Sequence, residues 1–179
     1  MSIVFQTTRV FYPVGGVHLE KFDALIEIFH GVLAPLYGSQ DKAIDQIRES
    51  KDRRCWLLYE GPQPVGVLVF KTVLSDEFVS EGVAQSVEIK SLFVVDPLKN
   101  SGKGIGSELL EKLQREVDQL ALGHLNIHVT VSETKQESLS FFCKKGFYIA
   151  HAWKDRYLPG VTEYLLACPA VSEETFLKR

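Results

Sequence analysis

Three glycines spaced two residues apart, Gly102, Gly104 and Gly106, form the stretch whose residue types best suit chemistry. They follow an unbroken apolar run at residues 92–95, which is typical of a strand buried on both faces. From Ile105 onward, apolar residues recur at helical spacing. Glycines leave backbone N–H groups unhindered, and a helix dipole favours an anion at the N-terminus. The stretch therefore predicts a phosphate-binding turn between a strand and a helix.

Two common nucleotide-binding motifs do not fit this spacing. A Walker A loop, G-x-x-x-x-G-K-[ST], would have its first glycine at Pro97 and its Ser or Thr at Gly104. A Rossmann fingerprint, G-x-G-x-x-G, would have its third glycine at Ser107. It also needs an acidic residue at the end of a second strand about 20 residues later, and the sequence has none there.

Residues 87–117 resemble motif A of the GNAT superfamily of acetyl-CoA-dependent N-acetyltransferases. The turn of that motif is written Arg/Gln-x-x-Gly-x-Gly/Ala, and Gly104 and Gly106 match its two glycines. Glu88 precedes Val94 by six residues, as in the strand of the family. The resemblance implies that the turn amides bind the pyrophosphate of acetyl-CoA. It also implies that the strand backbone pairs with the pantetheine arm.

A second block, residues 133–147, resembles the GNAT segment Asn-x-x-Ala-x-x-x-Tyr-x-x-x-Gly-Phe. The alignment places Lys135 at the asparagine, Ser138 at the alanine and Phe142 at the tyrosine. In the first block, Ser101 stands where Arg or Gln is usual, and one residue is added between Pro97 and the glycines. The resemblance spans about residues 55–168, with the glycines kept and several polar positions changed.

These departures change the expected chemistry. Phe142 replaces the tyrosine thought to protonate the departing CoA thiolate, and phenylalanine has no proton to give. A thiol pKa of about 8.5 makes the thiolate a fair leaving group, so the acid is useful rather than obligatory. Ser138, Ser140 and Cys143 are nearby candidates for a substitute. Ser101 is expected still to offer its backbone N–H.

The resemblance assigns the remaining roles. Glu88 is the expected general base, because an alkyl amine with a pKa of about 10 must lose a proton before it attacks the thioester. The backbone N–H of Val94 is expected to meet the charge that develops on the carbonyl oxygen. Lys99 and Lys103 would supply positive charge beside the turn. The expected cofactor-binding residues are Leu92, Phe93, Val94, Lys99, Ser101, Gly102, Lys103, Gly104, Ile105, Gly106, Ser107, Lys135 and Phe142.

The elements that must position these residues can be read from periodicity and breakers. We expect strands at residues 3–10, 55–59, 65–73, 86–95, 125–131, 147–153 and 162–168, helices at 17–33, 40–51, 105–120 and 135–145, turns at 34–39 and 61–64, and a polar stretch at 76–85. Residues 12–16 should break the first strand, and the first two helices fall where the family lines its acceptor pocket. His128 should lie on the polar face of its strand, with a structural role.

The expected fold class is α/β, a single GNAT-like domain over residues 1–179 with a mixed, mostly antiparallel central sheet and helices on both faces. Residues 171–179 are expected to form a loose tail. A net charge of -3 argues against nucleic-acid binding and is compatible with a cationic amine substrate. Three unpaired cysteines suit a cytoplasmic location, and no apolar run reaches the roughly 18 residues of a membrane span.

The sequence thus predicts an N-acetyltransferase that moves an acetyl group from acetyl-CoA to a primary amine by direct attack. The amine belongs to a small molecule or a peptide, and no metal is expected. One alternative is a non-catalytic CoA-binding domain, which the residues at Ser101 and Phe142 suggest. Another is a nucleotide-phosphate-binding enzyme that uses the same glycines. Exposed strands near the C-terminus could pair between chains, but the sequence does not decide the oligomeric state.

Overall fold

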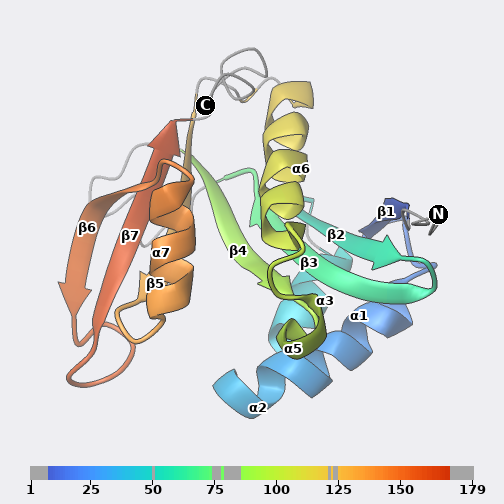
Figure 1. The fold of residues 1–179 in the computed structure, drawn as a ribbon, viewed down its shortest axis with the longest axis horizontal. Coiled ribbons are helices and arrows are strands. Elements are labelled where there is room, and N and C mark those ends of the chain that lie inside the picture. The colour runs from blue at the N-terminus through green and yellow to red at the C-terminus, as the bar shows by residue number, and fades with distance from the viewer. Residues whose placement is uncertain are drawn as a thin grey trace, which may run out of the picture. The chain divides into compact units, whose positions relative to one another are not determined.

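The computed structural model describes residues 8–49, 51–73, 78, 86–120, 122 and 125–169. Its elements follow one another along the chain as shown in Figure 1. They are β1 (Arg9–Val14), α1 (Phe22–Ile28), the π-helix η1 (Phe29–Leu33), α2 (Ala34–Tyr37), α3 (Asp41–Glu49), β2 (Arg53–Glu60), β3 (Gln63–Lys71), β4 (Ser86–Val94), α5 (Pro97–Asn100), α6 (Ile105–Gln119), β5 (Asn126–Ser132), α7 (Gln136–Lys144), β6 (Tyr148–Lys154) and β7 (Thr162–Pro169).

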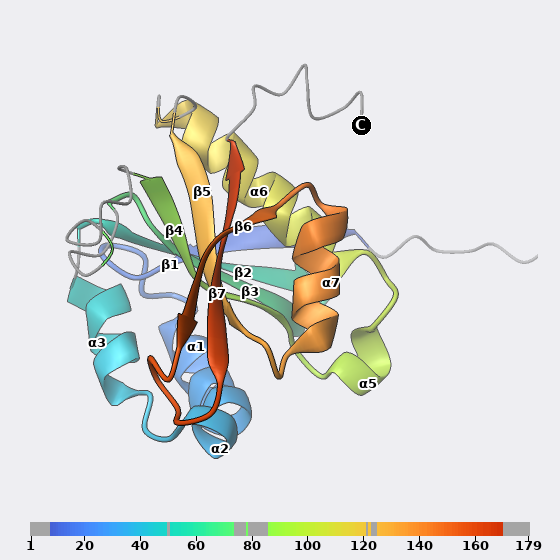
Figure 2. The same ribbon diagram turned by 90° about the vertical axis from the view of Figure 1, so that its left-hand side faces the viewer.

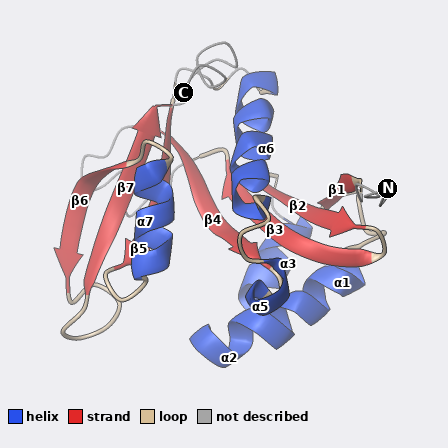
Figure 3. Cartoon of the chain, viewed as in Figure 1, coloured by secondary structure: helices blue, strands red, loops and turns tan. Residues whose placement is uncertain are grey.

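The described strands form one hydrogen-bonded order, β1-β2-β3-β4-β5-β7-β6 (Figure 3). β1 pairs with β2, β5 with β7 and β6 with β7 in antiparallel register. β4 and β5 are parallel, and their ladder covers only Ser86–Ile89 of β4. The prediction of an α/β fold with a mixed, mostly antiparallel sheet is confirmed.

The chain divides into two compact units, each built from two separate segments. The first unit contains Met1–Phe70 and Ser91–Leu113, and the second contains Lys71–Lys90 and Gln114–Arg179. The division falls within β4 and within α6, so both elements contribute residues to each unit.

In the first unit, helices cover both faces of the strands. One core cluster joins Val14, Cys55, Leu57, Tyr59, Val67 and Val69 of the strands to Phe22, Leu25, Ile28, Phe29, Ile44 and Ile47 of α1, η1 and α3. On the other face, a Cβ added to Gly66 of β3 would lie 3.0 Å from Ile105 and 3.1 Å from Leu109 of α6. This close approach explains a glycine inside an otherwise apolar strand. The apolar side chains of β3 are buried on both of its faces.

In the second unit, the two faces of the β4–β5–β7 sheet differ in chemistry. Residues that alternate along a strand share a face. One face carries buried apolar side chains, Val87, Ile89, Ile127, Val129, Val131, Leu166 and Cys168. The other face carries Ser86, Glu88, Asn126, His128 and Thr130 of β4 and β5, together with the apolar Leu165 and Ala167 of β7. Polar groups are therefore concentrated on one side of this sheet.

The bounds of the first strand differ from those that the sequence predicted. Residues 3–7 of the predicted strand lie outside the described residues, and β1 runs on to Val14 through Tyr12 and Pro13, which were expected to break it. A proline removes a backbone donor, which an outermost strand tolerates, and β1 is at one end of the strand order. The break comes at Gly15 and Gly16, which both have positive φ.

The first helix also differs from its prediction. It begins at Phe22 rather than residue 17, and it runs through η1 into α2, so residues 34–37 are helical and not a turn (Figure 2). Pro35 lies in the first turn of α2, directly after the π-helix η1.

Most other predicted elements are confirmed to within a few residues. These are α3, β2, β3, β4, α6, β5, α7, β6 and β7. Apart from Phe78, the polar stretch expected at residues 76–85 lies outside the described residues, as does the tail at 171–179. Within the described ranges, every helix is too short or too polar to cross a bilayer.

Candidate active site

The glycine-rich turn is held at its start by a short element that the sequence did not predict. β4 ends at Val94, and the N–H of Val95 donates to the carbonyl of Val65 at 2.9 Å. Asp96 then takes a left-handed φ of 49° and starts α5. The side-chain amide of Asn100 donates back to the carbonyl of Val95 at 2.7 Å. The one residue added before the glycines is accommodated in this closed turn.

The turn itself presents unpaired backbone donors. Gly102 and Gly104 have φ values of 76° and 77°, and a Cβ on either would meet open space. Among the described residues, none accepts a hydrogen bond from the N–H groups of residues 102–107. Consecutive free amides at a helix N-terminus form an anion-binding site. This geometry matches the predicted phosphate-binding turn.

Ser101 does not contribute as expected. Its backbone N–H already donates to the carbonyl of Pro97 at 2.9 Å, which closes α5. The expectation that Ser101 offers a free amide is therefore wrong. The reason is the helical turn of α5, which uses the amide of its C-terminal neighbour.

The two lysines beside the turn are both engaged with neighbouring residues. Lys99 forms a 2.8 Å ion pair with Asp96, and its side chain is 81% exposed. The ammonium of Lys103 lies 3.1 Å from the side-chain oxygen of Asn100 and 3.9 Å from Glu60. Both lysines still bring positive charge to the turn, as predicted.

Arg9 of β1 is a residue that the sequence analysis missed. Its Nη1 donates to the carbonyl of Lys103 at 3.0 Å and also contacts the carboxylate of Glu108 in α6. Its Nε donates to Glu60 at 2.9 Å. Burial lowers the pKa of Arg9, but the bonds to Glu60 and Glu108 outweigh burial and raise it, so the side chain is a permanent cation. No local motif signals this contact, because 94 residues separate Arg9 from Lys103.

The start of α6 is fixed from the other side by the core. Ile105 is only 1% exposed, while its backbone N–H remains among the free donors of the turn. Its side chain reaches the space above Gly66 of β3. Packing thus holds the predicted residues Ile105, Gly106 and Ser107 in place without consuming their amides.

Glu88, the predicted base, is buried in the second unit. Its side chain is 3% exposed, so it does not face solvent. Lys90, two residues along β4 and hence on the same face, places its Nζ 2.7 Å from Oε1 of Glu88. A carboxylate so buried requires partners, and Lys90 is one of them.

His128 of β5 stands in register with Glu88 on the adjacent strand. It is 3% exposed, and its Nδ1 has no hydrogen-bond partner among the described residues. Burial lowers its pKa, and the nearby Glu88 carboxylate offsets part of that effect. The sequence put His128 on the polar face correctly, but that face is itself buried here. A neutral imidazole with a free nitrogen beside a carboxylate can accept a proton.

In the second predicted block, aromatic rings surround Phe142, and a substitute acid stays a prediction. Phe142 is 5% exposed and makes edge contacts with Phe141 and Phe147 at 5.2 and 5.0 Å between ring centroids. Ser138 and Ser140 are exposed, as is Cys143. Lys135 precedes α7, and its carbonyl accepts the N–H of Leu139 at 3.0 Å. The expectation that Lys135 and Phe142 bind CoA stays a prediction.

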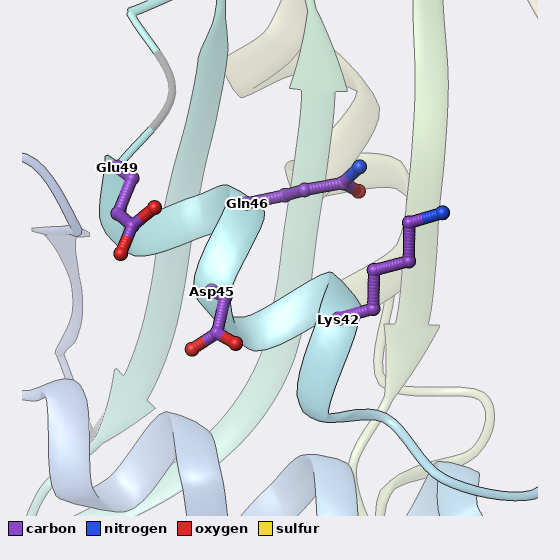
Figure 4. A pocket seen from close by; sticks show the side chains of 4 residues that line it. All are labelled: Lys42, Asp45, Gln46 and Glu49. Atoms are coloured by element: carbon purple, nitrogen blue, oxygen red, sulfur yellow. The ribbon is translucent and has the colours of Figure 1, made fainter.

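A shallow hollow lies over α3, one of the helices expected to line the acceptor pocket. Its volume is about 460 Å³, and its described lining consists of Lys42, Asp45, Gln46 and Glu49 (Figure 4). All four side chains come from one helix, so this hollow by itself defines no acceptor chemistry.

The comparisons with known proteins agree with this geometry. Residues 22–147 match the model of the acetyltransferase (GNAT) family. The structure is similar to Arabidopsis thaliana NAA60 in complex with acetyl-CoA (15% identity, 90% of this chain and 98% of that chain covered, TM-score 0.72). It is also similar to the ribosomal-protein-S18-alanine N-acetyltransferase of Escherichia coli (14% identity, 92% and 96% covered, TM-score 0.71). A third similar structure is Arabidopsis thaliana NAA50 with the bisubstrate analogue CoA-Ac-MVNAL (22% identity, 88% and 97% covered, TM-score 0.62). No relative among curated proteins matches the sequence.

The match covers well over half of the chain, so the protein belongs to the GNAT family of acetyltransferases. It is an acetyl-CoA-dependent N-acetyltransferase. This outcome confirms the predicted enzyme class and acetyl donor, and the nucleotide-phosphate alternative is set aside.

Proposed function

We propose that the free amides of residues 102–107 bind the pyrophosphate of acetyl-CoA. The observation that carries this proposal is that these amides, at the N-terminus of α6, have no acceptor among the described residues. The pantetheine arm would pair with the backbone of Leu92, Phe93 and Val94, which lies beyond the end of the β4–β5 ladder at Ile89. The N–H of Val94 would then meet the oxyanion.

We propose further that Glu88 removes the proton of the acceptor amine and that His128 assists. The neutral amine attacks the thioester carbon, the C–S bond breaks, and the CoA thiolate leaves. His128 faces Glu88 across the strand pair with a free Nδ1, so a proton taken by the carboxylate has a second acceptor close by. Phe142 cannot protonate the thiolate, and water would do so instead.

For the acceptor we propose the amine of a peptide. The support is that NAA50, a structural neighbour, was solved with the bisubstrate analogue CoA-Ac-MVNAL, and that the neighbour in E. coli carries a ribosomal protein in its name. A panel of peptides with free N-termini, set against polyamines and small amines at equal concentration, tests this. Faster CoA release with the small amines would contradict the peptide proposal.

We also propose a cytoplasmic location. Cys55, Cys143 and Cys168 form no disulfide within the part of the chain that the structure describes, which suits a reducing compartment. Cell fractionation tests it, and recovery from an oxidising compartment would contradict it.

The first experiment is a thermal shift with acetyl-CoA, CoA, ATP and NAD. Ligand at 100 times its dissociation constant should add about 2.7 kcal/mol to stability, or roughly 5–10 °C at this size. Glu88→Gln should keep the shift with acetyl-CoA and lose turnover by at least a hundredfold. Unchanged turnover in that variant would remove Glu88 from the role of base. No shift with either CoA form would remove the turn from the cofactor site.

A further inference from the structure

Lys90 holds a primary amine against the proposed base. Its Nζ lies 2.7 Å from Oε1 of Glu88, and its side chain is 31% exposed while that of Glu88 is 3% exposed. Both side chains leave the same face of β4, because they are two residues apart on a strand. The lysine thus reaches from the outside to a buried carboxylate.

This is the position that an acceptor amine must occupy. A general base acts on a proton within hydrogen-bond reach, about 2.6–3.2 Å between heavy atoms. If Glu88 is the base, an incoming amine sits where the Lys90 ammonium sits now. Lys90 also precedes Leu92, the first residue of the proposed pantetheine-binding segment, by two residues, or about 7 Å of strand. A lysine side chain is long enough to cover that distance once its Nζ turns from Glu88 toward Leu92.

We propose that Lys90 is an acetylation site of the enzyme itself, modified within the same chain from bound acetyl-CoA. This proposal rests on the proposed function, in particular on Glu88 as base and on the thioester lying along the end of β4. Lys90 then acts as an internal acceptor when no external amine is bound.

The step is balanced as an ordinary acyl transfer. Glu88 takes one proton from the Lys90 ammonium, and the neutral Nζ forms a bond to the acetyl carbonyl carbon. The C–S bond of the thioester breaks, and its electron pair leaves with the CoA sulfur. The second proton lost from the nitrogen goes to water. The products are an amide on Lys90, CoA with a protonated sulfur, and one proton released to solution.

Acetylation of Lys90 has two consequences for the site. The side chain loses its charge, so Glu88 loses its ion pair with a cation at 2.7 Å. The acetamide also fills the space in front of Glu88. The modified enzyme should therefore transfer acetyl groups to an external amine more slowly, and a bound acceptor should protect Lys90.

The test is to incubate the full chain with acetyl-CoA and map acetyl groups by mass spectrometry over time. The expected result is one acetyl group at Lys90, formed at least ten times faster than at Lys99. The comparison is informative because the Lys99 side chain is 81% exposed, so purely chemical acetylation would favour it over the 31% exposed Lys90. Acetylation at exposed lysines with no preference for Lys90 would overturn the proposal.

Four variants sharpen the result. Lys90→Arg keeps a cation beside Glu88 and should remove the modification, while Lys154→Arg, an exposed lysine of β6, should leave it unchanged. Glu88→Gln should slow it by at least a hundredfold in the enzyme-catalysed case. Lys90→Gln imitates the neutral amide and should lower turnover of an external amine in a way that Lys90→Arg does not.

The outcomes also separate this inference from the proposed function. If acetyl-CoA raises the melting temperature and the enzyme acetylates an external amine but leaves Lys90 unmodified, only the proposal of self-acetylation is overturned. A protein that neither binds acetyl-CoA nor modifies any amine overturns both. Loss of Lys90 acetylation on addition of the acceptor peptide would support competition for one position in front of Glu88.

Discussion

Arg9 Nη1 donates a 3.0 Å hydrogen bond to the backbone carbonyl of Lys103, so the first strand of the chain holds the glycine-rich turn. The same side chain contacts Glu60 and Glu108, two carboxylates that flank the turn. A phosphate approaching the free amides would meet repulsion from both carboxylates without that cation. Arg9 therefore both positions the turn and offsets unfavourable charge near it.

Arg9→Met should weaken CoA binding about tenfold. Losing a hydrogen bond to or from a charged group costs about 1.5–3 kcal/mol, and each 1.4 kcal/mol is a factor of ten in affinity. Isothermal titration with CoA measures the change. Arg48→Met, which removes an arginine that lies over the ring of Phe22 in the same unit, is the matched control and should bind CoA normally. Adding Glu108→Gln to Arg9→Met should recover part of the affinity, and equal affinity in all of these variants would contradict the role of Arg9.

Gly104→Val should abolish measurable CoA binding while the fold persists. Gly104 has φ +77°, and an added Cβ meets nothing within 4 Å, so the folded chain can hold the side chain at the cost of backbone strain of about 1–2 kcal/mol. The valine would project into space beside the free amides. Gly160→Val is the matched control, because Gly160 has φ +76° and equally open surroundings. Both variants should lose a similar amount of stability, and only Gly104→Val should lose CoA binding.

His128 should make stability depend on pH in the acid range. Its pKa is lowered in the folded protein, chiefly by burial, while the unfolded value is about 6.5. Between those two values the unfolded chain binds more protons, so the free energy of unfolding falls as pH drops below about 6.5 and levels off below the folded pKa.

Urea unfolding at a series of pH values tests this in His128→Gln. In the variant, the free energy of unfolding should fall less steeply with decreasing pH. The measured quantity is the difference between the variant and wild-type curves of unfolding free energy against pH. His18→Gln removes an exposed histidine and should follow the wild-type curve. Parallel curves for His128→Gln and the wild type would contradict the assignment.

The sequence predicted those parts of the fold and site that depend on local pattern. The glycines at positions 102–106, the apolar strand before them and the stripe of α6 are all continuous in sequence, and each was found where expected, although residues 92–95 are half-buried rather than buried on both faces. Glu88 was singled out by the resemblance of its strand to that of the family, and its role as base stays a prediction. Periodicity and turn chemistry are sufficient for such features.

The missing parts all depend on contacts between distant segments. Arg9 reaches a carbonyl 94 residues away, which no window of sequence reveals. His128 alternates correctly with its apolar neighbours, yet the polar face that it shares with Glu88 is covered in the folded chain. Pro13 and Pro35 were expected to break their elements, but Pro13 lies in an outer strand and Pro35 in the first turn of a helix. A proline is tolerated in both places, and the sequence does not show which place it occupies.

Phe142→Tyr should lower stability without a large gain in turnover. Phe142 is 5% exposed and enclosed by Phe141 and Phe147, so a new hydroxyl is buried beside aromatic rings. An unsatisfied buried hydroxyl costs about 1–3 kcal/mol. The expected change in kcat is less than threefold, because CoA thiolate leaves without an acid. A rise of a hundredfold would show instead that the hydroxyl reaches the leaving sulfur.

The two compact units should unfold as one domain, as the sequence analysis expected. Each unit is made of two chain segments, and both β4 and α6 are divided between them, so neither unit can lose its structure without disrupting an element of the other.

The two tryptophans report on the units separately, since Trp56 belongs to the first and Trp153 to the second. Fluorescence of Trp153→Phe and Trp56→Phe in urea should therefore give coincident transitions once corrected for the stability of each variant. Leu166→Ala removes a fully buried side chain of the second unit and should lower the free energy of unfolding by about 2–5 kcal/mol. The transition reported by Trp56, in the first unit, should then also move to a lower urea concentration. A Trp56 transition that stays in place would mean that the first unit is stable alone, and the chain would then have to be treated as two domains.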